Sequence, residues 1–185
     1  MRVITGKARG VVLKTPEGLQ TRPTSDRVKE AMFSIIQFDL PGTRVLDLFG
    51  GTGQLGIEAL SRGAASAVFV DAGEPACKLI RENLKRTKLE DQGRVVRSDY
   101  LQYLSTTKEK FDIILLDPPY AEVFLENSLK RISEIDILQS NGIIVTERPL
   151  EKALDFEISG FTRSRDYKYG NTLITIYRKE EYHNE

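Results

Sequence analysis

Apolar runs alternate with segments of helical periodicity through the middle of the chain. Five runs predict buried strands, at 44–49, 67–70, 94–97, 111–116 and 142–146. Helices are predicted between them, at 54–62, 74–88, 99–104 and 123–132. Strands separated by helices require right-handed crossovers. The order therefore predicts an α/β fold with a mainly parallel sheet and a ligand crevice at the carboxyl ends of its strands.

The N-terminal part of the chain has a different pattern. Short β-type stretches at 2–5 and 11–14 flank a glycine-bounded turn, which predicts a small hairpin. Capping side chains at 24–26 then precede apolar residues at helical spacing, and Pro41-Gly42 ends that element. The sequence therefore predicts a hairpin and a helix ahead of the main domain.

The C-terminal part of the chain is predicted to contain strands without helices between them. Three segments alternate polar and apolar residues with a period of two, at 154–158, 162–167 and 172–178. They predict an antiparallel edge on the parallel sheet. We therefore divide the chain into an N-terminal extension, 1–40, and a main domain, 41–185.

Composition places the chain among soluble globular proteins. It has 185 residues and a mass of 20.9 kDa, with 40% hydrophobic and 29% charged residues. The apolar runs are too short for a membrane span, and the N-terminus lacks the apolar core of a secretory signal. A single cysteine, Cys77, and a single histidine, His183, argue against a disulfide, a Cys/His metal cluster and a histidine general base. We expect a cytoplasmic protein without a metal.

The net charge is zero, but the charges are unevenly distributed. Residues 1–30 carry seven basic and three acidic side chains, so the remainder of the chain has a net negative charge. A basic segment on a mildly acidic body indicates attraction to a polyanion such as RNA.

A glycine-rich turn follows the first predicted strand of the main domain. Gly51, Gly53 and Gly56 satisfy the spacing G-x-G-x-x-G, which serves dinucleotides. Asp47, at the end of the strand, favours S-adenosylmethionine instead. Its carboxylate could hold an ammonium group, whereas it would repel a pyrophosphate.

Two further carboxylates end the next two strands. Asp71 can accept hydrogen bonds from both hydroxyls of a ribose, which is common to NAD and S-adenosylmethionine sites. Asp99 could accept from an adenine amino group or cap the helix that follows it, and these two roles are compatible.

The segment 111–120 is the most informative in the chain. An apolar strand ends in Asp117, Pro118, Pro119 and Tyr120. The two prolines stiffen the turn and remove two N–H donors, so the turn presents acceptors beside an aromatic ring. Such a turn can grip the exocyclic amine of a nucleobase while the ring stacks on the base.

The two turns resemble those of class I S-adenosylmethionine-dependent methyltransferases that carry (Asp/Asn)-Pro-Pro-(Tyr/Phe) and methylate amino groups. The segments 22–33, 47–64 and 169–172 are similar to the RsmD family, and the resemblance covers nearly the whole chain. That family methylates N2 of a guanine in bacterial small-subunit (16S) ribosomal RNA. Two departures are Gly50, where the family has alanine, and Ala72-Gly73, where more polar residues are usual.

The resemblance implies a Rossmann-like fold with a seven-stranded sheet and S-adenosylmethionine as cofactor. The implied cofactor residues are Asp47, Phe49, Gly51, Gly53, Asp71 and Asp99. The implied catalytic residues are Asp117, Pro118, Pro119 and Tyr120, which would hold the guanine amino group. The residues expected to contact RNA are Arg2, Lys7, Arg9, Arg22, Thr24 and Arg27. The expected partner is 16S RNA within a 30S subunit or an assembly intermediate, acted on by a monomer.

Three other functions stay open at this point. The same Asp-Pro-Pro-Tyr turn serves methylation of adenine or cytosine in DNA, although so short a chain leaves no sizeable target-recognition domain. The glycine spacing alone would also suit an NAD-dependent oxidoreductase. A noncatalytic RNA-binding assembly factor is a third alternative, which the intact turn disfavours. The sequence does not specify the target guanine or the role of Arg163 and Arg165.

Overall fold

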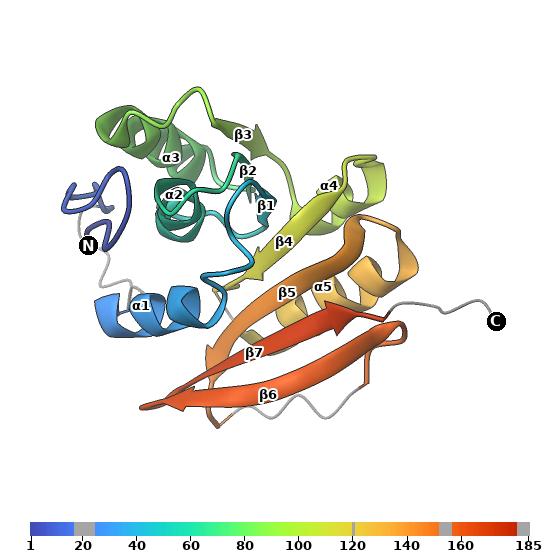
Figure 1. The fold of residues 1–185 in the computed structure, drawn as a ribbon. Helices are drawn as coiled ribbons and strands as arrows, with labels where there is room; N and C mark the ends of the chain where they lie inside the picture. Colours follow the sequence, from blue (N-terminus) through green and yellow to red (C-terminus); the bar gives the residue numbers. More distant parts are fainter. Residues whose placement is uncertain (17–24, 120, 152–156, 181–185) are drawn as a thin grey trace.

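A seven-stranded sheet with helices on both faces forms the body of the computed structural model (Figure 1). The structure describes residues 1–16, 25–119, 121–151 and 157–180. The helices are α1 (Asp26–Ile35), α2 (Gln54–Ser61), α3 (Glu74–Thr87), α4 (Tyr100–Thr106) and α5 (Ala121–Glu134). The strands are β1 (Arg44–Asp47), β2 (Ser66–Asp71), β3 (Gly93–Arg97), β4 (Phe111–Leu116), β5 (Leu138–Pro149), β6 (Phe161–Tyr169) and β7 (Thr172–Lys179).

The strand order is β3-β2-β1-β4-β5-β7-β6. Strands β1 to β5 are parallel, and β7 is antiparallel to both of its neighbours, β5 and β6. The predicted α/β fold with an antiparallel C-terminal edge is therefore confirmed. The direction of the crossovers changes between β1 and β4, so the loops after these two strands diverge and leave a crevice at their carboxyl ends.

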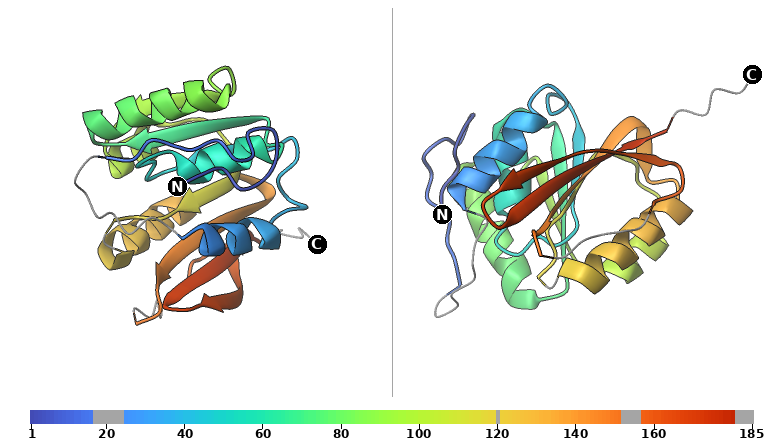
Figure 2. Two further views of the ribbon diagram at one scale, coloured as in Figure 1. Left: turned by 90° about the vertical axis from the view of Figure 1, so that its left-hand side faces the viewer. Right: turned by 90° about the horizontal axis from the view of Figure 1, so that it is seen from below.

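Alternation along the strands divides the buried side chains between two hydrophobic layers. On β1, Val45 packs with the layer under α1, α2 and α3, whereas Leu46 packs with the layer under α4 and α5. Figure 2 shows these two helix groups on opposite faces of the sheet. The helix α2 lies very close to β2, since a Cβ built on Gly56 would be 2.2 Å from Phe69 Cε1. A glycine at this position therefore brings the glycine-rich turn down onto the sheet.

The N-terminal segment 1–16 packs beside α2 and α3 (Figure 1). The predicted hairpin is present in a shorter form. Arg2 and Val12 form an antiparallel bridge, the N–H of Val3 donates to the Val11 carbonyl at 3.0 Å, and the N–H of Leu13 donates to the Met1 carbonyl at 3.1 Å. Beyond Val3 the first arm leaves this pairing. The N–H groups of Ile4 and Thr5 instead donate to the carboxylate of Glu58 on α2, at 2.9 and 3.0 Å. These two N–H groups are thus used to attach the segment to the main domain.

The extension shares its core with the main domain. Val3, Leu13 and Met32 are buried in the same layer as Phe69 of β2. The predicted helix is present as α1, and the Ser25 hydroxyl caps it by accepting from the N–H of Val28. Residues 1–16 and 25–40 consequently pack on the same core as the main domain.

The C-terminal strands differ from the prediction in one place. The strands β6 and β7 match their predicted segments to within two residues at each end, and β5 is longer than predicted. The strand expected at 154–158 falls mostly on 152–156, which lies outside the described residues, and residues 157–158 are not in a strand. None of the helices in the described part is long and apolar enough to cross a membrane.

Candidate active site

A cavity of about 1110 Å³ lies at the carboxyl ends of β1, β2 and β4. Its wall includes the glycine-rich turn between β1 and α2 and the loop between β2 and α3. The cavity is where the sheet topology places a ligand crevice. It contains four of the carboxylates that the sequence analysis singled out, namely Asp47, Asp71, Asp99 and Asp117.

Two glycines give the turn after β1 its shape. Gly51 and Gly53 have φ values of +55° and +79°, which a residue with a side chain rarely adopts. Gly51 lines the cavity, and its N–H donates to Asp71 Oδ2 at 2.9 Å. Gly53 is not among the lining residues, because a Cβ on it would face Ile80 and Ile57. Gly53 is the N-cap of α2, and its own backbone adopts the left-handed conformation.

Asp47 forms the buried end of the cavity. Its side chain is 1% exposed, and Oδ2 accepts a hydrogen bond of 3.0 Å from the N–H of Gly56. Burial raises the pKa of Asp47 to about 8, and the nearby carboxylates of Asp117 and Asp71 add to the increase. A buried carboxyl group of this kind gains most from a positive charge placed beside it.

Asp71 and Asp99 are held by backbone N–H groups. The two oxygens of Asp71 accept from Gly51 and Gly73, at 2.9 and 2.8 Å, which orients the carboxylate at the rim of the cavity. Asp99 caps α4, since Oδ1 accepts from Leu101 and Gln102 at 2.9 and 3.2 Å. The capping role expected for Asp99 is confirmed, and its side chain also lines the cavity.

An aromatic cluster forms one wall of the cavity. The rings of Phe49, Tyr100 and Phe124 lie 5.2 to 6.2 Å apart between centroids, in tilted and edge-to-face arrangements. All three residues line the cavity. Such a wall provides a flat apolar surface for a planar ligand.

The N-terminal segment completes the cavity on another side. Met1 and Pro16 line it, and the Thr52 hydroxyl lies 3.4 Å from the Met1 sulfur. Asn83 of α3 is buried and donates to the carbonyls of Lys14 and Thr52, at 3.1 and 2.8 Å. One amide group therefore connects the N-terminal segment to the glycine-rich turn.

The Asp-Pro-Pro turn after β4 separates two cavities. Asp117 and Pro119 line the large cavity and also a second pocket of about 480 Å³, which Pro118 lines as well. Tyr120 lies outside the described residues. The second pocket is bounded by the start of α1, the end of β5 and the turn between β6 and β7. A group in this pocket and a ligand in the large cavity would meet at Asp117.

Comparison with known proteins identifies the family of this chain. The family model described as "Conserved hypothetical protein 95" matches residues 1–178. The chain belongs to this family. It is 41% identical to "Putative rRNA methyltransferase YlbH" of Bacillus subtilis, over 97% of this chain and 99% of that protein. It is 29% identical to "Ribosomal RNA small subunit methyltransferase D" of Escherichia coli, over 97% of this chain and 90% of that protein.

A solved structure supports the same family assignment. The protein titled "Putative methyltransferase yhhF from Escherichia coli" matches with a TM-score of 0.88 and 28% identity, over 98% of each chain. The resemblance to the RsmD family is thereby confirmed, as is the Rossmann-like class I methyltransferase fold.

The structure of this RsmD-family chain describes four of the six residues that are expected to contact RNA. Arg2, Lys7 and Arg9 are exposed on the N-terminal segment, and exposed Arg27 lines the second pocket. Arg22 and Thr24 lie outside the described residues. Lys29 is fully buried, donates to the Arg2 carbonyl at 2.6 Å and lies 3.7 Å from Glu58. Burial lowers the pKa of Lys29, and its ammonium belongs to the core rather than to the basic surface.

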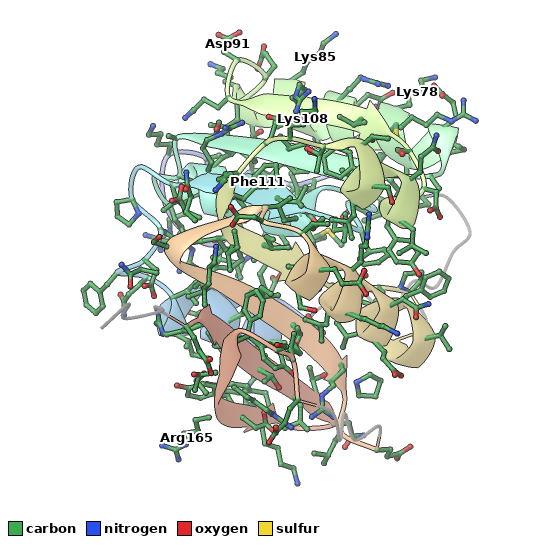
Figure 3. The ribbon with its side chains drawn as sticks, turned by 90° about the vertical axis from the view of Figure 1, so that its right-hand side faces the viewer. Lys78, Lys85, Asp91, Lys108, Phe111 and Arg165 are labelled. Carbon is green, nitrogen blue, oxygen red and sulfur yellow. The ribbon has the colours of Figure 1, made fainter. Side chains whose placement is uncertain are left out.

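The two arginines of uncertain role lie on β6. The Arg163 guanidinium donates to Asp166 at 2.7 Å, whereas that of Arg165 lies 6.0 Å from the centre of the Tyr167 ring. Figure 3 shows Arg165 at the outer edge of the molecule. Neither residue lines the two cavities described above.

Several residues of this RsmD-family site were missed from the sequence. They are Tyr100 and Phe124 in the aromatic wall, Asn83 beneath the turn, and Glu147 and Arg148 in the second pocket. Glu147 and Arg148 do carry a signal, because they directly follow the apolar run 142–146 as Asp117 follows the run 111–116, although the structure includes both in β5. The partners of Asn83 are 69 and 31 residues away, so no local pattern indicates them.

Proposed function

We propose that this protein transfers a methyl group from S-adenosylmethionine to the exocyclic N2 of a guanine in small-subunit ribosomal RNA. Membership of the family, with relatives described as rRNA methyltransferases, supports S-adenosylmethionine-dependent methylation of rRNA. One observation supports an exocyclic amine as the group that receives the methyl group. The Asp-Pro-Pro turn lies between a large nucleoside-sized cavity and a second pocket, so it faces both reactants.

The large cavity suits S-adenosylmethionine better than a dinucleotide. Asp71 and Asp117 line it, and their carboxylates would repel a pyrophosphate while attracting the positively charged sulfonium and ammonium groups; Asp47, which also lines it, can release its proton when such a cation binds. Asp71, oriented by two N–H groups, has lone pairs left for a ribose diol. Phe49 and Asp99, which both line the cavity, would hold the adenine ring and accept from its amino group. The NAD-dependent alternative is therefore disfavoured.

The residues of the chain act by positioning rather than by covalent catalysis. Bound S-adenosylmethionine supplies a methyl group attached to a positively charged sulfur. Asp117 and the Pro118 carbonyl accept the hydrogens of the guanine amine, which turns the nitrogen lone pair toward that methyl group. S-adenosylmethionine held by the large cavity would supply the methyl group to this nitrogen, with S-adenosylhomocysteine as the leaving product. The nitrogen then gives up one proton, for which the Asp117 carboxylate is the adjacent acceptor.

The RNA approaches from the side of the second pocket. Arg27 lines this pocket, and the exposed side chains of Arg2, Lys7 and Arg9 add positive charge on the N-terminal segment. Exposed basic side chains on a protein of zero net charge provide local contacts with the phosphate backbone. We place the acceptor in the cytoplasm, as small-subunit RNA within a particle or assembly intermediate, acted on by a monomer.

The first test is transfer of tritium from labelled S-adenosylmethionine to small-subunit RNA or to particles that lack the modification. We expect label in N2-methylguanosine after nuclease digestion, and none in DNA offered at the same concentration. Asp117→Ala should lose at least 100-fold in turnover while binding S-adenosylhomocysteine almost as well, since the change removes an acceptor of the amine. Full turnover by Asp117→Ala would overturn its assigned role, and no transfer to any RNA acceptor would favour the noncatalytic alternative.

A further inference from the structure

A second carboxylate lies beside Asp117 in the smaller pocket. In the parallel pair of β4 and β5, Leu115 is opposite Val145 and Leu116 is opposite Thr146. The next position in this register sets Asp117 beside Glu147, on adjacent strands about 4.8 Å apart. Both residues line the pocket of about 480 Å³.

The alternation of side chains places the two carboxylates on the same face of the sheet. Ile113 and Leu115 of β4 pack in the layer under α1 to α3, and so do Ile143 and Val145 of β5. Two residues further along each strand, Asp117 and Glu147 continue on that face. Two carboxylates therefore point toward the same side, where α1 begins.

Positive charge borders this pair on the side of α1. Arg27 in the first turn of α1 lines the pocket, and the amino end of α1 borders it at Ser25, whereas the Arg148 guanidinium lies 3.7 Å from Asp166. The partial positive charge of a helix N-terminus and the Arg27 guanidinium offset the repulsion between the carboxylates. The pocket can thus present two acceptors side by side to a neutral ligand.

The Watson–Crick edge of guanine is complementary to two adjacent acceptors. Guanine carries N1–H directly beside its N2 amino group, so it offers two neighbouring donors. Adenine carries an unprotonated N1 beside its amino group, and that lone pair would face a carboxylate. At the two positions that would meet the carboxylates, the bases therefore differ by the hydrogen on N1, and on the far side of N1 guanine carries O6 where adenine carries C2–H.

We propose that Glu147 accepts the N1–H of the target guanine while Asp117 holds the neighbouring amine, so that Glu147 is the residue that selects guanine. The inference rests on the proposed function and adds to it the chemical basis for choosing the base. A site built to accept a hydrogen bond rejects an analogue that lacks the donor by factors of up to about 10⁴. Asp117 alone would grip the amine of either purine.

The test replaces the acceptor guanine with 2-aminopurine, which keeps the 2-amino group and lacks the N1 hydrogen. Small-subunit RNA with either base at the mapped position is prepared by ligation and folded into particles. The wild-type protein should use guanine at least 100-fold better in kcat/KM. Glu147→Gln can donate to the bare N1, so it should lose activity on guanine and lower this preference at least 10-fold.

A matched variant controls for the loss of one negative charge. Glu151 is exposed, lies four residues further along and does not line the pocket. Glu151→Gln should keep the wild-type preference for guanine over 2-aminopurine. Binding of S-adenosylhomocysteine, measured by calorimetry, should be the same for the wild type and both variants, which shows that the folded site is intact.

The outcomes separate this inference from the proposed function. Wild-type transfer to N2 of guanine together with an unchanged preference in Glu147→Gln would overturn the role of Glu147 alone. Equal use of guanine and 2-aminopurine by the wild type would overturn it as well. No wild-type transfer to guanine would overturn the proposed function and, with it, this inference.

Discussion

At the scale of single residues, Asp47 is the most unusual group of the site. It is buried at the end of the large cavity, and its backbone partner, the N–H of Gly56, does not offset the cost of burying its charge. Burial therefore raises its pKa to about 8 from an ordinary value near 3.8. The group takes up a proton on folding at neutral pH and can release it when a cation binds beside it.

We expect the free energy of unfolding of the ligand-free protein to fall as the pH rises from about 4 to about 8. Between these values the unfolded chain is ionised at Asp47 and the folded chain is protonated, so Asp47 alone lowers stability by up to about 1.4 kcal/mol per pH unit. Asp47→Asn keeps an acceptor for Gly56 and removes the titration. Urea unfolding from pH 5 to pH 8 should show a flatter pH dependence for this variant than for the wild type.

The same residue makes a second measurement possible. The affinity for S-adenosylmethionine should increase from pH 6 to pH 8 in the wild type, because the cationic ligand favours ionised Asp47. In Asp47→Asn the affinity should be lower and nearly independent of pH. Calorimetric titrations at three pH values check this, and parallel pH dependences for the two proteins would contradict the assignment of the raised pKa.

At the scale of elements, the helices α2 and α3 attach the N-terminal segment through buried polar side chains. Glu58 of α2 accepts from Ile4 and Thr5, and Asn83 of α3 bonds both Lys14 and Thr52. The Asn83 carboxamide oxygen also accepts from the Lys14 N–H at 2.7 Å. The segment that carries the exposed basic residues is thus connected directly to the turn that shapes the large cavity.

We expect Asn83→Ala to loosen this connection. Three hydrogen bonds of a fully buried amide are lost, which should lower the free energy of unfolding by about 3 kcal/mol. The affinity for S-adenosylhomocysteine should fall as well, because Thr52 loses its support. Chemical denaturation and calorimetry measure the two effects, and limited proteolysis should cut near residue 14 faster than in the wild type.

The surface ion pair between Lys14 and Glu82 gives the control for that experiment. These groups lie 2.8 Å apart on the same two segments, but the pair is exposed to solvent. Glu82→Gln should leave the unfolding midpoint close to that of the wild type. Because Glu82 also lines the large cavity, the control compares stability and not ligand affinity. If Glu82→Gln and Asn83→Ala behaved alike, the buried amide would have no special part in holding the segment.

The elements also show how far the sequence could be used to predict the structure. The strand at 111–116 is predicted to the residue, because its apolar run is bounded by charge on one side and by the Asp-Pro-Pro turn on the other. The hairpin at 2–14 is shorter than predicted, because the carboxylate of Glu58, more than 50 residues away, accepts from the N–H groups of Ile4 and Thr5. Contacts of this kind leave no periodic signal in the sequence.

At the scale of the whole molecule, the distribution of charge decides how the RNA can approach. The zero net charge of the chain gives no general attraction to RNA, so the exposed basic side chains of the N-terminal segment have to provide it. Lys29 is buried and therefore adds no charge to this surface, and Arg2 Nε lies 3.5 Å from Asp26 Oδ2. Lys7 and Arg9 are exposed, and the described residues include no salt-bridge partner for either.

We expect the double change Lys7→Gln and Arg9→Gln to weaken binding of small-subunit RNA and to lower the slope of log affinity against log salt by about 2. The affinity for S-adenosylhomocysteine should not change, because neither residue lines the large cavity. Lys108 and Lys130 provide the matched control, since both are exposed and lie after α4 and on α5, on the face of the sheet opposite the N-terminal segment. Their double change to Gln should leave RNA binding close to that of the wild type. An equal loss in both double variants would mean that the RNA responds to total charge and not to the N-terminal segment.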